Sequence, residues 1–346
     1  MEESINLNKI CQNLLEGLPS RAKEVIVRRF GLKTRERETL EAIGEDHNIT
    51  RERVRQIEND GFSKIIPKFN QHKQVFEYFN RYLKKEGGLK REDILLAKLG
   101  GQKFQNHVYF LLDLNEKFQR SSLSPEFYPF WTNDRNSQNL AKEIINNLLK
   151  KLKERNQPLS FSEIAKIYKS DSSAKKTKPL PSESLLSYIE VSRDIEQGLD
   201  NLFGLKYWPE INPRGIRDRA YLAFKKTSKP LHFVEAASFI DRLDLQGAAE
   251  KRKTLPQTVH NELIRDPRFV LVGRGIYALK EWGYEPGIVR EIIEKTIEER
   301  GPMTKEEIIK EVSKQRLVKP NTILINLQNK QFFIKNSEGK YLLKEA

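Results

Sequence analysis

Side chains that can form paired hydrogen bonds with DNA bases follow one another in TRERVRQIEN, residues 50–59. A helix is predicted here, because apolar positions recur at helical spacing: Val54, Ile57, Gly61 and Ile65. The opposite face of that helix holds polar residues: Arg51, Glu52, Arg55, Gln56 and Asn59. Arginine can bond guanine O6 and N7, glutamine can bond adenine N6 and N7, and glutamate can accept a hydrogen bond from cytosine N4. The spacing therefore predicts a helix that reads base edges, with a solvated charged face as the alternative.

The residues before this helix are predicted to hold it in a helix-turn-helix. Leu40 and Ile43 indicate a short amphipathic helix that ends near Gly44, and residues 48–49 form the turn. Thr50 is a suitable N-cap, because its hydroxyl can accept a hydrogen bond from an N–H group of the first turn. The cap position is where a helix-turn-helix first meets DNA, and a helix N-terminus attracts phosphate.

Three stretches carry a resemblance to a known family: LPSRAKEVIVRRFGL, TLEAIG and ITRERVRQIE. From about Leu14 to Lys68, without a gap across the helix-turn-helix, the chain resembles the fourth conserved region of bacterial sigma-70 family factors. The resemblance implies binding to the upstream promoter element and to the flap of RNA polymerase. Carried over by position, it implies base-reading residues and two phosphate-backbone contacts: Arg51, Glu52, Arg55 and Gln56 for the bases, Thr50 and Arg53 for the backbone.

The sequence departs from that family in two respects. After QIE, residues 59–63 read NDGFS, where the family continues with a basic, alanine-rich turn. Two cations that commonly face DNA or activators are therefore missing, which weakens the electrostatic part of binding. The sequence also lacks a second-region motif with the aromatic cluster that melts promoter DNA. The chain alone is therefore not expected to open DNA.

An apolar group in the same region, Val25, Ile26 and Phe30, has two interpretations. The three residues either form a surface that contacts RNA polymerase or belong to the core of the helix-turn-helix domain.

The rest of the chain repeats one pattern four times. GGLKREDI, QPLSFSEI, KPLHFVEA and GPMTKEEI each place an apolar anchor four residues before an acid. The anchors lie 70, 72 and 72 residues apart, and each is followed by its acid: Leu89 and Asp93, Leu159 and Glu163, Leu231 and Glu235, Met303 and Glu307. Each stretch follows a helical pattern and precedes a second apolar-periodic segment, which we interpret as a further helix: residues 105–114, 192–202, 256–266 and 320–329.

Each repeat closes in runs of β-branched and aromatic residues, and the last two runs, around GRG and NSEG, predict β-hairpins. Three helices followed by a hairpin are typical of a winged helix. The predicted fold is therefore mainly α, with a sigma region 4-like helix-turn-helix followed by four tandem winged-helix modules. The predicted domains are 1–74, 75–135, 136–213, 214–285 and 286–346. Long loops are expected at 170–184 and 246–256.

The third module carries a second resemblance, from about Lys229 to Tyr284, and GRGIYALKEW is its strongest part. This segment is similar to the HARE-type helix-turn-helix of the RNA polymerase delta subunit, some restriction enzymes and eukaryotic chromatin proteins. Gly273 and Gly275 would allow a tight wing turn. The aromatic side chains of the wing, Tyr277 and Trp282, are expected to pack in the core rather than to stack on bases. The resemblance implies a transcription or DNA context without fixing a contact.

Composition narrows the function classes. The 346 residues carry 62 Lys and Arg against 48 Asp and Glu, and the net charge of +14 favours a polyanionic partner. The one cysteine, Cys11, excludes an internal disulfide, and the five histidines show no ligand spacing. No phosphate-binding loop, metalloprotease, nucleophile-elbow or CxxC motif is present, so we expect no catalytic residue, cofactor or metal. The absence of an N-terminal leader pattern and of long apolar stretches indicates a cytoplasmic protein that does not bind membranes.

The function predicted from these features is sequence-specific recognition of double-stranded promoter DNA in transcription initiation or its regulation, with RNA polymerase as a partner and no enzymatic activity. Two alternatives stay open. The first is a protein-interaction scaffold of winged helices, and the second is the DNA-targeting subunit of a restriction or chromatin system.

Overall fold

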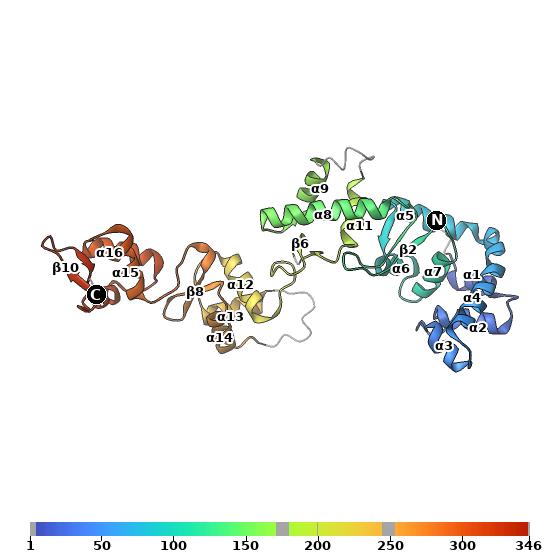
Figure 1. The fold of residues 1–346 in the computed structure, drawn as a ribbon, viewed down its shortest axis with the longest axis horizontal. Helices are drawn as coiled ribbons and strands as arrows, with labels where there is room; N and C mark the ends of the chain where they lie inside the picture. The colour runs from blue at the N-terminus through green and yellow to red at the C-terminus, as the bar shows by residue number, and fades with distance from the viewer. Residues whose placement is uncertain (1–4, 171–179, 199, 244–252, 345–346) are drawn as a thin grey trace. The chain divides into compact units, whose positions relative to one another are not determined.

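The computed structural model describes residues 5–170, 180–198, 200–243 and 253–344. The chain is mostly helical, with short sheets, and divides into two compact units, residues 1–206 and residues 207–346. Most of the helices and some of the strands are labelled in Figure 1, and the two units are described separately. The mainly α fold class predicted from the sequence is confirmed. Within the described residues, no helix is both long enough and apolar enough to span a membrane.

The first unit opens with four helices and a 3-10 helix: α1 (Leu7–Leu15), α2 (Ser20–Arg29), α3 (Leu40–Asp46), α4 (Arg51–Ile65) and η1 (Ile66–His72). Helices α3 and α4 are the predicted helix-turn-helix, and α2 packs against both. The predicted end of α3 near Gly44 is wrong, because the helix continues to Asp46. It stops there because Asn48 takes a left-handed conformation, with φ of 52°.

The next elements follow the order helix, strand, helix, helix, strand, strand: α5 (Lys73–Lys85), β1 (Leu89–Arg91), α6 (Glu92–Gly100), α7 (Gln105–Asp113), β2 (Gln119–Ser121) and β3 (Phe130–Thr132). The second repeat follows the same order: α8 (Ser137–Arg155), β4 (Leu159–Ser160), α9 (Phe161–Ser170), α11 (Ser182–Glu190), β5 (Ile195–Gln197) and β6 (Leu202–Leu205). In both sheets all pairings are antiparallel and the last strand lies in the centre, in the orders β1-β3-β2 and β4-β6-β5.

One predicted helix is wrong. Residues 192–202 contain strand β5, which pairs with β6, and the helix of this repeat is instead α11. Its buried residues Leu185, Tyr188 and Ile189 have helical spacing, whereas Gly198 interrupts the later segment. Of the two predicted loops, residues 171–179 and 244–252 lie outside the described residues. The flanks of these loops are more helical than expected, because α11 begins at Ser182 and α14 at Pro256.

The second unit contains the third repeat, in the same order: α12 (Gly215–Thr227), β7 (Leu231–His232), α13 (Phe233–Arg242), α14 (Pro256–Arg265), β8 (Phe269–Gly273) and β9 (Ile276–Leu279). The sheet order is β7-β9-β8, and the 3-10 helix η2 (Lys280–Trp282) follows. The last repeat has three helices and a hairpin: α15 (Val289–Arg300), α16 (Lys305–Gln315), α17 (Pro320–Leu327), β10 (Phe333–Lys335) and β11 (Tyr341–Leu343). An isolated bridge between Met303 and Tyr341 stands where the other repeats have their first strand.

The hairpins predicted around GRG and NSEG are present, as β8–β9 and β10–β11. Gly275 turns the first with φ of 70°, a conformation that favours glycine. Position 273 favours glycine for a different reason. A Cβ there would lie 2.7 Å from the carbonyl oxygen of Leu317. Tyr277 is buried and Trp282 packs against the same core, as expected.

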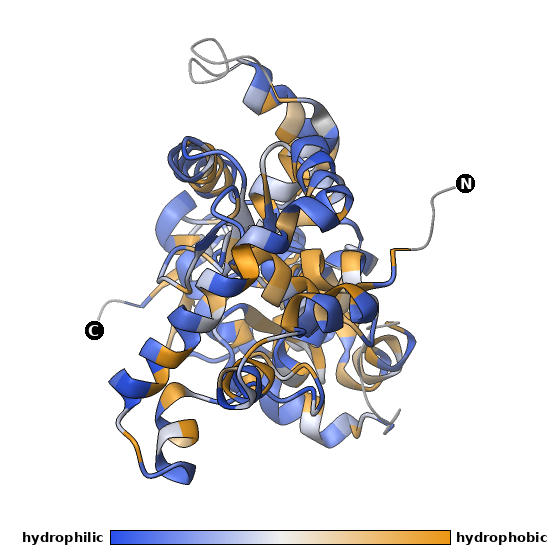
Figure 2. Cartoon of the chain, turned by 90° about the vertical axis from the view of Figure 1, so that its right-hand side faces the viewer, coloured by the Kyte–Doolittle hydropathy of each residue, from blue (hydrophilic) through white to orange (hydrophobic). Residues whose placement is uncertain are grey.

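The core of the first unit crosses the predicted boundary between residues 74 and 75. One cluster of buried side chains joins Leu14 and Phe30, from the first helices, to Phe79, Phe110 and Trp131 of the first repeat. Figure 2 shows hydrophobic and hydrophilic residues alternating along individual helices, as expected for helices buried on one side only. The helix-turn-helix and the first repeat therefore form one packed body, and a fragment ending at residue 75 would lose part of its core.

Candidate nucleic-acid interface

The start of α4 is built as the sequence predicts. The Thr50 hydroxyl accepts a hydrogen bond from the Arg53 backbone N–H at 3.2 Å and caps the helix. The turn before it is closed by the Ile49 backbone N–H, which donates to the Gly44 carbonyl oxygen at 2.9 Å. The first turn of α4 is therefore held in a fixed position relative to α3.

The predicted apolar stripe of α4 packs inward. Val54 is fully buried in a small cluster with Val25 of α2 and Ile43 of α3, and Ile57 packs against it. Gly61 allows α4 to approach α2 closely, because a Cβ there would lie 2.7 Å from Ile26 Cδ1. All the predicted polar-face residues, and the two backbone-contact residues, are exposed: Thr50, Arg51, Glu52, Arg53, Arg55, Gln56 and Asn59.

Two pairs of side chains order this exposed face. Arg55 donates two hydrogen bonds to Glu52, from Nη2 at 2.6 Å and from Nε at 2.9 Å, and Arg53 Nη1 donates to Gln56 Oε1 at 3.0 Å. The bonds with Arg55 lower the pKa of Glu52, and the same bonds raise the pKa of Arg55. Both side chains are exposed, so the pair can exchange its partners for base edges at small cost. Arg51 stands at the start of the same face.

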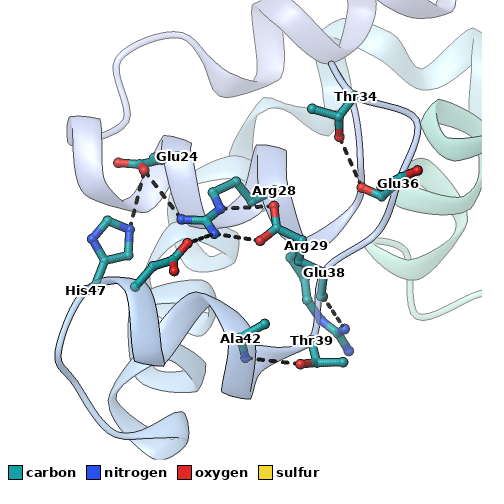
Figure 3. A network of polar contacts seen from close by, with 10 residues as sticks. Glu24, Arg28, Arg29, Thr34, Glu36, Glu38, Thr39, Ala42 and His47 are labelled. Atoms are coloured by element: carbon teal, nitrogen blue, oxygen red, sulfur yellow. Dashed lines mark hydrogen bonds and ion pairs between the residues drawn. The ribbon is translucent and has the colours of Figure 1, made fainter.

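A network around Arg28 fixes α2 against α3 (Figure 3). The guanidinium of Arg28 donates to both carboxylate oxygens of Glu38, with Nε–Oε1 at 3.0 Å, and bonds Asp46 at the end of α3. These contacts lower the pKa of Glu38, chiefly through the hydrogen bond with Arg28, and raise the pKa of Arg28. His47 Nε2 lies 3.3 Å from Glu24 Oε1, so the residue after α3 also lies beside α2.

The apolar group proposed as a polymerase surface belongs to the core. Val25 and Ile26 are fully buried and Phe30 is 3% exposed. The Phe30 ring packs against Phe62 and, in an edge-to-face arrangement at 5.1 Å, against Phe110 of the first repeat. The interpretation of these residues as a polymerase contact is wrong, because no part of them is free for a partner.

Contacts from the first repeat to the loop before α3 were not predicted. Asn106 Nδ2 donates to the carbonyl oxygens of Gly31, at 3.1 Å, and Arg35, at 2.9 Å. The Arg37 guanidinium lies over the Tyr109 ring at 4.1 Å. These partners stand about seventy residues away in sequence, so no local pattern could have indicated them.

The third helices of the four repeats differ in exposure. In α7 every residue from Gln105 to Leu112 is buried or half-buried, and in α11 the residues from Ser184 to Glu190 are likewise covered. In contrast, α14 exposes Gln257, Asn261 and Arg265 along one face. Ile264 of α14 and Ile325 of α17 are also exposed, at 62% and 64%. Of these four helices, α14 and α17 therefore expose more of their surface to solvent than α7 and α11 do.

Within the described ranges, no group of three or more His, Cys, Asp or Glu side chains could hold a metal ion. Cys11 is buried in the core of the first unit, and burial raises the pKa of its thiol well above the usual range.

Known proteins match the chain where this surface lies. The family model for sigma-70, region 4, matches residues 14–65. RNA polymerase sigma factor RpoS of Coxiella burnetii is 40% identical over 63 residues, which are 18% of this chain and 18% of that protein. RNA polymerase sigma factor RpoD of Helicobacter pylori is 49% identical over 61 residues, which are 17% of this chain and 9% of that protein. RNA polymerase sigma factor sigB of Arabidopsis thaliana is 44% identical over 64 residues, 18% of this chain and 11% of that protein.

The chain thus spans less than a fifth of the length of these relatives. The matched segment runs from the end of α1 to the end of α4 and includes the whole helix-turn-helix. Residues 14–65 are therefore similar to sigma-70 region 4, and this similarity covers only part of the chain.

Proposed function

We propose that the chain is a DNA-binding transcription protein that recognises an upstream promoter element through α4 and acts in transcription initiation beside RNA polymerase. The observation that carries the proposal is the exposed face of α4. Its Arg51, Arg55 and Gln56 are residues able to make bidentate contacts to bases, on a capped helix in a region 4 segment. Glu52 would accept from cytosine, while Thr50 and Arg53 would bind the phosphate backbone.

We further propose that the four repeats are winged helices, with boundaries near residues 75, 136, 214 and 286, and that the third is of the HARE type. The element order shared by the first three repeats and the central position of the last strand support this assignment. The buried Tyr277 and the Gly275 turn fit the wing expected in the third repeat.

The repeats divide into two roles in this proposal. In the first two, α7 and α11 are covered by the first unit itself. The α7 helix shares a core with the helix-turn-helix, and α11 packs against β1 of the first repeat. In this proposal the first repeat therefore braces the helix-turn-helix and the second braces the first, instead of reading DNA. In the last two, α14 and α17 are open to solvent, and the net charge of +14 on the whole chain favours contact with a polyanion. A second DNA-reading helix beyond α4 is therefore assigned to residues 214–346.

A protein-interaction scaffold is the second candidate, and one observation favours it. The open helices of the last two repeats expose apolar side chains, Ile264 and Ile325, which suit a protein partner better than a phosphate backbone. In this case α14 and α17 would dock on protein, and RNA polymerase is the partner that the sigma-like segment suggests.

The test uses the full chain. Selection from random duplex DNA should yield a preferred element, and a mixture of the chain with purified RNA polymerase at micromolar concentration should elute together from a sizing column. A chain that selects no sequence but elutes with polymerase would establish the scaffold. A chain that does neither would overturn both candidates.

A further inference from the structure

A pocket of about 310 Å³ lies between the helix-turn-helix and the first repeat. One wall is the loop between α2 and α3, and the other is the turn before α7 together with the start of α7. Three exposed cations line it: Lys33, Arg35 and Lys103. Among the described residues, no carboxylate lines the pocket or forms an ion pair with these cations. The pocket is therefore electropositive and concave, which favours an anion.

The start of α7 adds hydrogen-bond donors to this charge. Phe104 stands at the N-cap position and offers no side-chain acceptor, and the first turn consists of Gln105, Asn106 and His107, all in the lining. The backbone N–H groups of a first turn have no partner within the helix and carry the positive end of its dipole. An uncapped helix start of this kind is suited to a phosphate oxygen.

An independent observation comes from His107. The residue is 6% exposed, and its Nδ1 atom is buried without a hydrogen-bond partner in the described part of the chain. Burial lowers the pKa of the imidazole, so the ring is neutral at pH 7 and carries one N–H. Buried polar atoms are usually paired, so an unpaired ring nitrogen in a residue that lines a basic pocket indicates a missing hydrogen-bond partner.

The two walls of the pocket are joined by contacts already described. Asn106 Nδ2 fixes the carbonyl groups of Gly31 and Arg35, and Arg37 is stacked on Tyr109. The loop that carries Lys33 and Arg35 is therefore positioned before any ligand arrives, which reduces the entropy lost on binding.

We propose that this pocket binds a phosphate group, with Lys33, Arg35 and Lys103 neutralising its charge while the first turn of α7 and His107 donate hydrogen bonds. The shared chemistry fits two sources, a backbone phosphate of duplex DNA and a free phosphate or phosphomonoester. The proposal rests on the pocket between the helix-turn-helix and the first repeat. It does not depend on base reading by α4.

The test follows the ring nitrogens of His107 in the full chain, labelled with ¹⁵N-histidine, with the resonance assigned by His107→Asn. Inorganic phosphate is added against chloride at equal ionic strength. The His107 resonance should move in a saturable way and report an Nδ1–H ring. The double variant Lys33→Gln/Lys103→Gln should weaken phosphate binding at least tenfold.

The control Lys84→Gln/Lys117→Gln removes the same charge at exposed positions outside the pocket and should keep the response. Circular dichroism of both double variants confirms that they fold. If both double variants lose the response equally, the effect is one of general charge and the site is refuted.

Duplex DNA of random sequence separates the two sources. If a backbone phosphate occupies the pocket, the duplex moves the same resonance, and the pocket variant lowers the salt dependence of DNA binding by about one unit of slope. If the ligand is a free phosphate, the duplex leaves the resonance unchanged while inorganic phosphate moves it. No response to either ligand overturns the proposal. Loss of sequence discrimination by α4 would instead count against the proposed function alone.

Discussion

Gly44 of α3 lies directly against the backbone of Ile49, the residue that ends the turn before α4. The Ile49 N–H donates to the Gly44 carbonyl oxygen at 2.9 Å, and a Cβ on Gly44 would lie 2.7 Å from the Ile49 carbonyl oxygen. Because backbone cannot move aside as a flexible side chain can, the turn closes this tightly only with glycine at position 44.

Gly44→Ala should therefore destabilise the protein by about 1–3 kcal/mol, the usual cost of overpacking. Alanine favours a helix over glycine by about 1 kcal/mol, which offsets part of that cost. Urea unfolding measures the change, with Glu45→Ala on the exposed side of the same helix as the control. An unchanged or raised unfolding midpoint for Gly44→Ala would show that the turn can relax.

The Arg28–Glu38 pair predicts a pH dependence. The folded pKa of Glu38 lies below its ordinary value of 4.5, so the pair stabilises the folded state above about that pH. This stability is lost as the pH falls below 4.5 and through the folded pKa of Glu38, where the carboxylate becomes protonated. Glu38→Gln should lower the free energy of unfolding at pH 7 and should lose less stability than the parent between pH 7 and pH 3.

The measurement is urea unfolding at the two pH values. Glu45→Gln, at an exposed position of α3, is the matched control and should behave like the parent. Equal acid sensitivity of Glu38→Gln and the parent would show that other carboxylates dominate.

The shared core predicts that a change in the first repeat unfolds the helix-turn-helix. Phe110 is fully buried and contacts Phe30 edge to face, and Phe110→Ala should cost about 3–5 kcal/mol. Hydrogen exchange should then quicken in α2 and α4 as well as in α7. Quickening confined to α7 would indicate two separate folding units.

The bidentate pair on α4 predicts a change of specificity. Glu52→Gln removes the carboxylate that holds Arg55 and raises the net charge of the face by one. Binding to random duplex DNA should therefore strengthen, while the ratio of affinities between the preferred and the random duplex falls. Fluorescence anisotropy with both duplexes measures this, and Glu41→Gln, an exposed acid on α3, is the control for charge. An unchanged affinity ratio would show that Glu52 takes no part in reading DNA.

The local features of α4 could be predicted from the sequence. The long-range contacts that hold the helix-turn-helix against the first repeat could not. The Thr50 cap, the buried Val54 and the exposed Arg51 and Arg55 all reflect helical periodicity and short-range hydrogen bonding, which the chain encodes within a few residues. The burial of Phe30 by Phe110 depends on packing across eighty residues, and no periodic pattern reports that.

The misplaced helix of the second repeat has a similar cause. Residues 192–202 have apolar spacing compatible with either helix or strand, and pairing of Ile195 with Leu205 decides for the strand. Conversely, the repeat period itself was visible because its anchors, such as Leu89 and Leu159, are fully buried at equivalent strand positions.

The central claim is that α4 reads bases, and the most direct test compares Arg55→Ala with the parent on two duplexes. The full chain is titrated with its preferred duplex and with a random duplex at the same salt concentration. Arg55→Ala should cost about 1–3 kcal/mol on the preferred duplex and much less on the random one, and Arg51→Ala and Gln56→Ala should behave alike. Equal weakening on both duplexes would contradict the account, because it would leave the face of α4 with phosphate contacts alone.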